Sequence, residues 1–302
     1  MTTIVEEPRL GLVGRVRKWG ELVTFSHTIF MMPFAAAAVV LAFAEPRAPL
    51  TVFRLAAMIA CMVCARSSAM AFNRWADRDI DAKNPRTQGR PVPSGRISPG
   101  EAMIVTVVAG LAFCGFAATL GFWPAVLAPP VLLVLLGYSL AKRFTWLAHA
   151  WLGFALALAP GGAWVGTGAA PNGGIVALMV GVLTWLLGFD VLYALQDEAF
   201  DKANGLFSIP SRFGTRGAMR IAIAAHVVTV AMLGTCGALL HRGPVFFLGV
   251  AAVAVVLVVE HRLVRGKDGA ADLAKIPKAF FDCNAYVSMG FFATTLLDAL
   301  VR

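Results

Sequence analysis

Two long stretches without any charged residue constrain what this chain can fold into. Residues 102–141 and 144–189 contain no Asp, Glu, Lys or Arg over 40 and 46 positions. A helix that crosses a bilayer needs roughly 20 apolar residues, so each stretch predicts two membrane spans. Segments rich in glycine and proline, at 121–124 and 170–174, lie near the two midpoints and predict the breaks between spans. The chain is therefore expected to be a helical membrane protein.

The composition supports this prediction. Charged residues make up only 14% of the chain and apolar residues 59%, whereas a soluble domain carries about 25% charged residues. A conventional soluble enzyme and a disordered protein are therefore excluded, and the continuous apolar runs do not alternate as in a membrane barrel. We predict an all-α integral membrane protein with nine transmembrane helices in a single domain, residues 1–302. The expected spans are 22–44, 52–76, 102–120, 124–141, 146–168, 173–196, 218–240, 244–261 and 279–300.

The basic residues predict the orientation in the membrane. The N-terminal segment and the connections after spans 2, 4, 6 and 8 carry 21 of the 26 Lys and Arg residues. By the positive-inside rule, these segments are cytoplasmic and the C-terminus is outside. The basic excess thus reports topology, and nucleic-acid binding is not expected. A cleaved signal peptide is not expected either, because the N-terminus lacks a short apolar region with a small-residue cleavage site.

The few acidic residues cluster at the cytoplasmic ends of two predicted spans. The chain has only 17 of them. At 100° per residue, each cluster forms one polar stripe along its helix. Two facing rows of carboxylates repel each other unless cations lie between them, and their oxygens suit Mg²⁺, which usually also binds substrate phosphates. The stripes are Asn73, Asp77 and Asp81 at the end of span 2, and Asp190, Tyr193, Asp197 and Asp201 at the end of span 6.

Basic residues follow both acidic stripes, with no covalent nucleophile at hand. Cations beside acidic clusters are typical of a metal-plus-cation clamp for a diphosphate. The candidate diphosphate-binding residues are Arg86, Arg90, Lys142 and Arg212.

A few titratable residues lie inside the predicted spans. Arg66 lies about 10 Å deeper than Asn73 along span 2, where a charge is costly unless it faces a polar cavity. We therefore expect Arg66 to mark a functional site. The histidines His27, His149 and His226 are interpreted as hydrogen-bonded packing residues rather than catalytic bases.

The two stripes and the connection after the first resemble the motifs of the UbiA superfamily of intramembrane aromatic prenyltransferases. The first motif of that family, Asn-Asp-x-x-Asp-x-x-x-Asp, is matched at Asn73, Asp77 and Asp81. A basic connection, Arg-Thr-x-x-Arg-Pro-x-Pro-Ser-Gly, follows at 86–95, and the second motif, Asp-x-x-Tyr-Ala-x-x-Asp-x-x-x-Asp, spans 190–201. The resemblance covers nearly the whole chain and implies nine helices around a central cavity.

The resemblance implies a Mg²⁺-dependent transfer reaction at the bacterial inner membrane. A polyprenyl group would pass, as an allylic carbocation, from polyprenyl diphosphate to a ring carbon of a hydroxylated aromatic acid, in respiratory quinone biosynthesis. The acceptor would be of the 4-hydroxybenzoate or dihydroxynaphthoate type. On this hypothesis the catalytic, metal-binding residues are Asn73, Asp77, Asp81, Asp197 and Asp201, and the acceptor-binding residues are Arg66, Asp190 and Tyr193.

One residue departs from the family pattern. Arg74 stands where the first motif usually has its first Asp. Because it lies 100° from Asn73 on the helical wheel, its side chain need not face the predicted metals. An Arg here looks like a bacterial branch described as 4-hydroxybenzoate polyprenyltransferase-like and associated with menaquinone formation through futalosine. Residues 25–28 and 142–146 look like that branch too.

Two other classes of membrane protein also use carboxylates. A secondary transporter is one, but its charges usually lie near the membrane midplane and its halves show weak internal repeats. A CDP-alcohol phosphotransferase is the other, but the compact Asp-x-x-Asp-Gly-x-x-Ala-Arg motif of that family is absent from this sequence. Within the prenyltransferase hypothesis, homogentisate and haem-type acceptors are the further alternatives.

Overall fold

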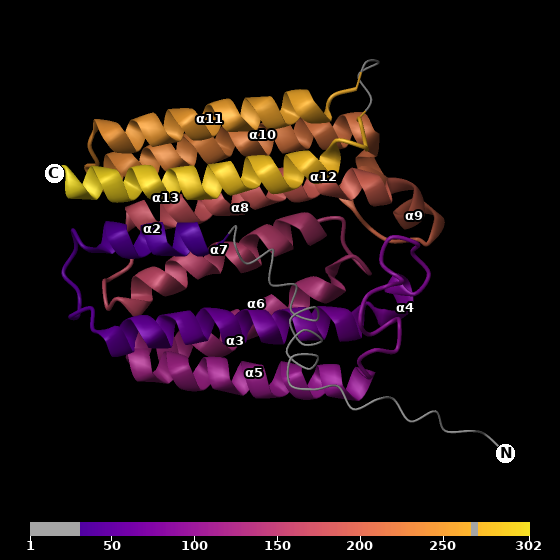
Figure 1. The fold of residues 1–302 in the computed structure, drawn as a ribbon, viewed down its shortest axis with the longest axis horizontal. Coiled ribbons are helices and arrows are strands. Elements are labelled where there is room, and N and C mark those ends of the chain that lie inside the picture. Colours follow the sequence, from indigo (N-terminus) through magenta and orange to yellow (C-terminus); the bar gives the residue numbers. More distant parts are fainter. Residues whose placement is uncertain (1–30, 267–270) are drawn as a thin grey trace.

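The computed structural model describes residues 31–266 and 271–302, which form helices and their connections (Figure 1). Within these ranges the only β-pairing is an isolated bridge between Arg265 and Ala271. The helices are α2 (Met32–Ala42), α3 (Val52–Ala76), α4 (Arg78–Asp81), α5 (Pro99–Leu120), α6 (Phe122–Ala141), α7 (Ala148–Gly166), α8 (Gly173–Ala194), η2 (Leu195–Asp197), α9 (Glu198–Ala203), α10 (Ile209–Leu239), α11 (Pro244–Val264), α12 (Ile276–Lys278), η3 (Ala279–Cys283) and α13 (Asn284–Leu300).

The all-helical membrane architecture is confirmed in the described part of the chain. Six helical segments are long and apolar enough to cross a membrane: 52–76, 99–120, 122–141, 173–203, 209–239 and 244–264. The other three expected spans contain α2, α7 and α13, which are shorter or less apolar. Residues 22–30 of the first expected span lie outside the described residues. Nine membrane crossings and a central cavity therefore stay predictions.

Polar side chains cap several of these helices. Thr51, Ser98 and Asn172 each accept a hydrogen bond from a backbone N–H in the first turn of α3, α5 and α8. Ser208 does the same for α10, in a capping box with Ser211. The cap begins a short helical segment at Ile209, but Gly214, with φ 67° and ψ 171°, interrupts the helix. The long apolar part of α10 therefore begins after Gly214, close to the predicted start at 218. A cap begins a helix before its apolar portion enters the membrane.

Helix α8 runs through the centre of the bundle. It packs mainly against α7 and α10, while α3 packs against α5 and α6, and α11 against α13 (Figure 1). The fully buried aromatic side chains of the main core include Phe34, Trp185 and Phe291, from three different helices. Outer helices instead leave large apolar side chains uncovered, such as Leu111 and Leu133, which are about 70% exposed. Lipid tails are the solvent that accepts such a surface.

The short helices α4, α9 and α12 lie at one end of the bundle (Figure 1). The α2–α3 connection and the C-terminus lie at the opposite end. Both acidic segments are therefore at the same end, because α4 ends the first and α9 ends the second. The structure thus confirms that the two predicted stripes share one side of the molecule.

Candidate active site

The first acidic segment lies where α3 gives way to α4. Asn73 is in the last turn of α3, Asp77 lies between the two helices, and Asp81 ends α4. The Nδ2 of Asn73 donates to Asp77 Oδ2 at 2.9 Å. Asp77 departs from helical geometry, but the N–H of Asp81 still bonds its carbonyl at 2.7 Å. The stripe predicted from helical periodicity is therefore preserved across the junction.

The second acidic segment continues α8 through the turn η2 into α9. Asp190 is in α8, Asp197 ends η2, and Asp201 lies in α9. Asp197 and Asp201 are buried, although both are ionisable carboxylates. Burial of a charge is costly unless it is paired, so the partners of these side chains determine what the site is able to do.

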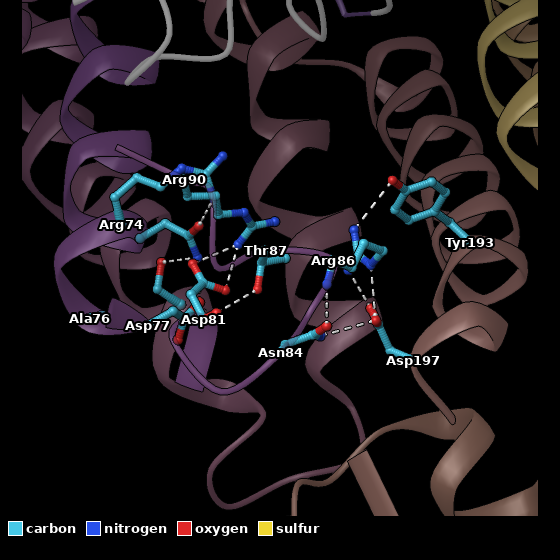
Figure 2. Close-up of polar contacts among 12 residues, drawn as sticks. Arg74, Ala76, Asp77, Asp81, Asn84, Arg86, Thr87, Arg90, Tyr193 and Asp197 are labelled. Carbon is cyan, nitrogen blue, oxygen red and sulfur yellow. Dashed lines mark hydrogen bonds and ion pairs between the residues drawn. The ribbon is translucent and has the colours of Figure 1, made fainter. Parts of the chain in front are cut away.

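The connection between α4 and α5 bridges the two acidic segments (Figure 2). Arg86 forms a two-pronged ion pair with Asp197, with N···O distances of 3.0 and 2.5 Å, and Asn84 Nδ2 donates to the same carboxylate at 3.3 Å. Arg90 donates to both oxygens of Asp81 at 2.8 Å. Because planar guanidinium groups match carboxylates in this way, the connection is bound firmly to both segments. The two stripes are thus joined through one basic loop.

Two cations from the end of α6 complete the cluster. The Nζ of Lys142 lies 3.9 Å from Asp201 Oδ2, and the Nη2 of Arg143 lies 3.9 Å from Asp77 Oδ1. Arg143 also donates to the carbonyl of Ala76. Asp77, Asp81, Asp197 and Asp201 therefore each have at least one cationic neighbour. In the described part of the chain, no three His, Cys, Asp or Glu side chains are arranged to hold a metal ion.

Asp77 is a partly buried carboxylate beside a second negative charge. Burial of its side chain, and then the negative charge of Asp81, raise the pKa of Asp77 to about 6. Lys142, Arg143 and Arg90 act in the opposite direction. An extra cation beside Asp77 and Asp81 would relieve this repulsion, which makes the position attractive for a positive charge.

The acceptor-side candidates lie on two helices. Tyr193 is one turn from Asp197, and its hydroxyl accepts a 3.4 Å hydrogen bond from Arg86. Asp190 lies a further turn into the bundle, and its Oδ2 forms a 2.7 Å hydrogen bond with His149 Nδ1. Arg66 lies within α3 and interacts electrostatically with Tyr138 of α6. The structure therefore joins Tyr193 to the carboxylate cluster through Arg86, while Asp190 has a separate partner.

For two arginines, the observed surroundings differ from those predicted. The guanidinium of Arg212 lies over the rings of Trp146 and Phe213, at 5.3 and 5.6 Å from their centroids, and none of its described contacts is with either acidic segment. Arg74, which need not have faced the site, is buried, and its Nη1 lies 3.4 Å from Asn73 Oδ1. Figure 2 shows it near Asp81 and Arg90. The residue that departs from the family motif is therefore part of the polar cluster.

Sequence reasoning missed Asn84, and it treated His149 as a packing residue. Asn84 was visible only as part of a polar connection, and nothing in its spacing singled it out. The contact of His149 depends on how α7 crosses α8, which a single-helix wheel does not contain. His27 lies outside the described residues. His226 is hydrogen-bonded, with its Nδ1 2.9 Å from His261 Nε2, as expected of a packing histidine.

Comparison with known proteins identifies the family. Residues 30–284 match the UbiA prenyltransferase family. The 4-hydroxybenzoate octaprenyltransferase of Nitrosomonas eutropha is 34% identical over 240 residues, which cover 78% of this chain and 80% of that protein. The enzyme of the same name from Dechloromonas aromatica is 30% identical over 251 residues, 79% of each chain.

Solved structures show the same fold. A UbiA homolog from Aeropyrum pernix K1 has a TM-score of 0.79 and 30% identity, covering 90% of this chain and 98% of that one. A UbiA homolog from Archaeoglobus fulgidus bound to GPP and Mg²⁺ has a TM-score of 0.72 at 17% identity, covering 94% and 99%. A helical membrane bundle of this architecture defines the protein as an intramembrane prenyltransferase. The chain belongs to the UbiA prenyltransferase family, as its motifs predicted.

Proposed function

We propose that this protein transfers a polyprenyl group from a polyprenyl diphosphate to a ring carbon of a hydroxylated aromatic acid in respiratory quinone biosynthesis, with Mg²⁺ as cofactor. One observation carries the proposal: Arg86 and Arg90 of one loop bind the acidic segments at the ends of α3 and α8. The names of related proteins support this choice of substrates. Close relatives are named 4-hydroxybenzoate octaprenyltransferase, and a protein of the same fold is bound to GPP and Mg²⁺.

The donor set fits Mg²⁺ in its chemistry. Asn73, Asp77 and Asp81 on one side, and Asp197 and Asp201 on the other, supply the hard oxygen ligands that this ion prefers. Asp201 Oδ2 is buried without a hydrogen bond from the described residues, and Lys142 Nζ is its nearest cation at 3.9 Å. These carboxylates would hold Mg²⁺, which would supply positive charge to stabilise the negative charge on the leaving group.

The chain's own cations supply the rest of the clamp. In this structure, Arg86 neutralises Asp197 and Arg90 neutralises Asp81. With Mg²⁺ held by these carboxylates, Arg86 and Arg90 would be available at the same place to bind diphosphate oxygens. Lys142 is next to Asp201 and would join them. The same positive charges thus neutralise the acidic side chains before the substrate binds and the departing diphosphate afterwards. Neutralising the diphosphate lowers the barrier to breaking the allylic C–O bond.

The position of the acids disfavours a transporter. All four paired carboxylates lie at the ends of helices, in the segments 77–81 and 197–201, and not at the middle of a span. The attacking aromatic ring would approach from the bundle side of the diphosphate, where Arg66 could pair with its carboxylate and Asp190 with its hydroxyl. An apolar bundle keeps water from the allylic carbocation before the ring carbon captures it.

The test is product analysis with purified protein in detergent. Geranyl diphosphate and Mg²⁺ would be incubated with 4-hydroxybenzoate, a dihydroxynaphthoate and homogentisate, and the products identified by mass spectrometry. We expect one aromatic acid to gain a geranyl group and EDTA to abolish the reaction. Transport of a solute without any product, or turnover with a CDP-linked donor alone, would overturn the proposal.

Variants connect the reaction to the acidic segments. Replacing Asp77 or Asp197 by Ala should abolish transfer while the protein remains folded in the membrane. Asp79→Ala is the matched control, since this aspartate lies in the same segment but its side chain is 76% exposed and pairs only with Arg78 on the surface. Full activity in both Asp77→Ala and Asp197→Ala would refute the metal assignment.

A further inference from the structure

A histidine and an aspartate form a pair on the bundle side of the candidate site. His149 comes from the first turn of α7 and Asp190 from α8. The Nδ1 of His149 lies 2.7 Å from Asp190 Oδ2, a short hydrogen bond between side chains 41 positions apart in the sequence. Neither residue contacts the two Arg-bound carboxylates, Asp81 and Asp197.

The two members of the pair differ in exposure. The side chain of His149 is 1% exposed, whereas that of Asp190 is 22% exposed. A small molecule is therefore able to reach the carboxylate of Asp190 but not the imidazole behind it. Within the described residues, Asp190 makes no other side-chain hydrogen bond, so its remaining lone pairs are available to a ligand.

The second nitrogen of His149 indicates the charge on the pair. His149 Nε2 is buried and has no hydrogen-bond partner among the described residues. An imidazolium would bury an N–H without an acceptor there, so the neutral ring is favoured, with its hydrogen on Nδ1. Nδ1–H then donates to Asp190 Oδ2, which accepts this hydrogen bond. The pair is thus a fixed carboxylate with an imidazole that orients it, in a largely apolar part of the bundle.

The position of Asp190 matches that of the acceptor rather than the diphosphate. Asp190 precedes Asp197 by seven residues, which places it about 10 Å further into the bundle along α8. Tyr193 lies between them and already contacts Arg86. With the diphosphate held at the Asp197 level, its allylic carbon points into the bundle, and the ring that attacks this carbon lies near the level of Asp190.

We propose that Asp190, oriented by His149, is the proton acceptor for the hydroxyl group of the aromatic substrate, an inference that rests on the proposed function. As the C–O bond of the donor breaks, its electron pair stays with the diphosphate. The ring carbon next to the hydroxyl forms the new C–C bond while Asp190 takes the hydroxyl proton, which gives a neutral dienone. The ring proton then leaves to the diphosphate, and Asp190 returns its proton to the oxygen.

The pair assigns different roles to its two residues. Asp190 is the catalytic residue, because its carboxylate contacts the acceptor. His149 is a positioning residue, which acts only through the hydrogen bond that holds the carboxylate. A proton acceptor of this kind raises rates by about 100-fold or more. Its benefit is confined to the acceptor half of the reaction, because breaking the donor C–O bond requires no proton acceptor.

The experiment separates the two halves of the reaction. Asp190→Asn, His149→Leu and His149→Asn would be assayed with geranyl diphosphate, Mg²⁺ and 4-hydroxybenzoate, and also without acceptor, where slow release of diphosphate reports donor cleavage alone. For Asp190→Asn we expect kcat for transfer to fall about 100-fold, with diphosphate release and the KM for the donor retained. His149→Leu should lower kcat in the same way, and His149→Asn should restore part of it, because its amide still donates near the Nδ1 position.

A more acidic acceptor tests the proton step itself. The hydroxyl of 3-fluoro-4-hydroxybenzoate gives up its proton more readily, so the deficit of Asp190→Asn relative to the unsubstituted protein should shrink with this substrate. An equal deficit with both acceptors, full transfer by Asp190→Asn, or a parallel loss of diphosphate release would each overturn the inference. If the unsubstituted protein cleaves geranyl diphosphate but prenylates no hydroxylated acid, the proposed function fails, and the inference fails with it.

Discussion

Arg86 contacts two residues of the second acidic segment, Asp197 and Tyr193. It binds Asp197 with two N–H groups, and its guanidinium also contacts Tyr193 through a hydrogen bond and lies 5.5 Å from the ring centroid. Because Asp197 is buried, losing Arg86 would leave a carboxylate whose only described hydrogen bond comes from Asn84. The residue therefore contributes both to the resting site and, on the proposed function, to the diphosphate clamp.

We expect Arg86→Ala to reduce kcat/KM for the prenyl diphosphate by about 100-fold, the usual loss for a preorganised donor to developing negative charge. Arg86→Lys should recover only part of this, since an ammonium group does not bind a carboxylate or phosphate with two prongs. Steady-state kinetics would measure both. Lys202→Ala is the control, because it removes a cation at the same end that pairs with Glu198 on the surface. An equal loss in Lys202→Ala would mean that only total charge matters.

A second buried polar group affects stability rather than chemistry. The side chain of Asn284 is fully buried, accepts from Trp185 Nε1 at 2.9 Å and donates to Glu260 Oε1 at 3.3 Å. Asn284→Leu would leave both partners buried and unpaired, at about 1–3 kcal/mol for each group. The midpoint of thermal unfolding in detergent should fall by several degrees. Tyr286→Ala, on the exposed face of the same helix, should change it little, and equal midpoints for the two variants would contradict this account.

At the scale of elements, the close packing of α7 against α8 depends on a glycine. A Cβ on Gly153 of α7 would lie 2.6 Å from the carbonyl oxygen of Leu183 in α8. Main-chain atoms are unable to move aside as a side-chain tip does, so Gly153→Ala must push the helices apart. His149 is one turn from Gly153 on the same face of α7. The crossing therefore also determines the contact between His149 and Asp190.

We expect Gly153→Ala to lower the thermal midpoint and to reduce transfer to the aromatic acceptor more than release of diphosphate without it. Gly162→Ala is the matched control in the same helix, because nothing lies within 4 Å of its added Cβ. That variant should be neutral or slightly stabilising, since Ala favours a helix over Gly by about 0.5–1 kcal/mol. If both variants behaved alike, the close approach of α7 and α8 would have no role.

Elements show clearly what the sequence could predict. Hydropathy located the helices because a lipid-facing helix must be apolar throughout, and helical periodicity aligned Asn73, Asp77 and Asp81 because their spacing follows the helical turn. Hydropathy predicted the long part of α10 after the kink at Gly214 but not the short helical segment before it, because a Ser208 cap carries no hydropathy signal. The ion pairs of Arg86 and Arg90 could not be predicted, because they depend on the path of an irregular loop.

For the whole molecule, the distribution of charge determines how the bundle is oriented in the membrane. The end that contains α4 and α9 carries nearly all the basic connections, whereas the opposite end has Arg47, Arg54, Arg242 and Arg302. From the positive-inside rule we therefore predict that the α4 end, and the candidate site with it, faces the cytoplasm. This orientation also suits the chemistry, because a diphosphate head group and a water-soluble aromatic acid would both approach from the aqueous side.

Cysteine labelling would test this orientation in intact bacterial cells. The five native cysteines would first be replaced by Ala or Ser, and one cysteine introduced at Ala44 or at Lys83, both of which are exposed and lie in connections at opposite ends. A membrane-impermeant maleimide should modify Ala44→Cys in cells with a permeable outer membrane. It should modify Lys83→Cys only after the inner membrane is opened. The reverse pattern would place the acidic segments outside the cell, and labelling of both from outside would mean that the charge bias does not orient this bundle.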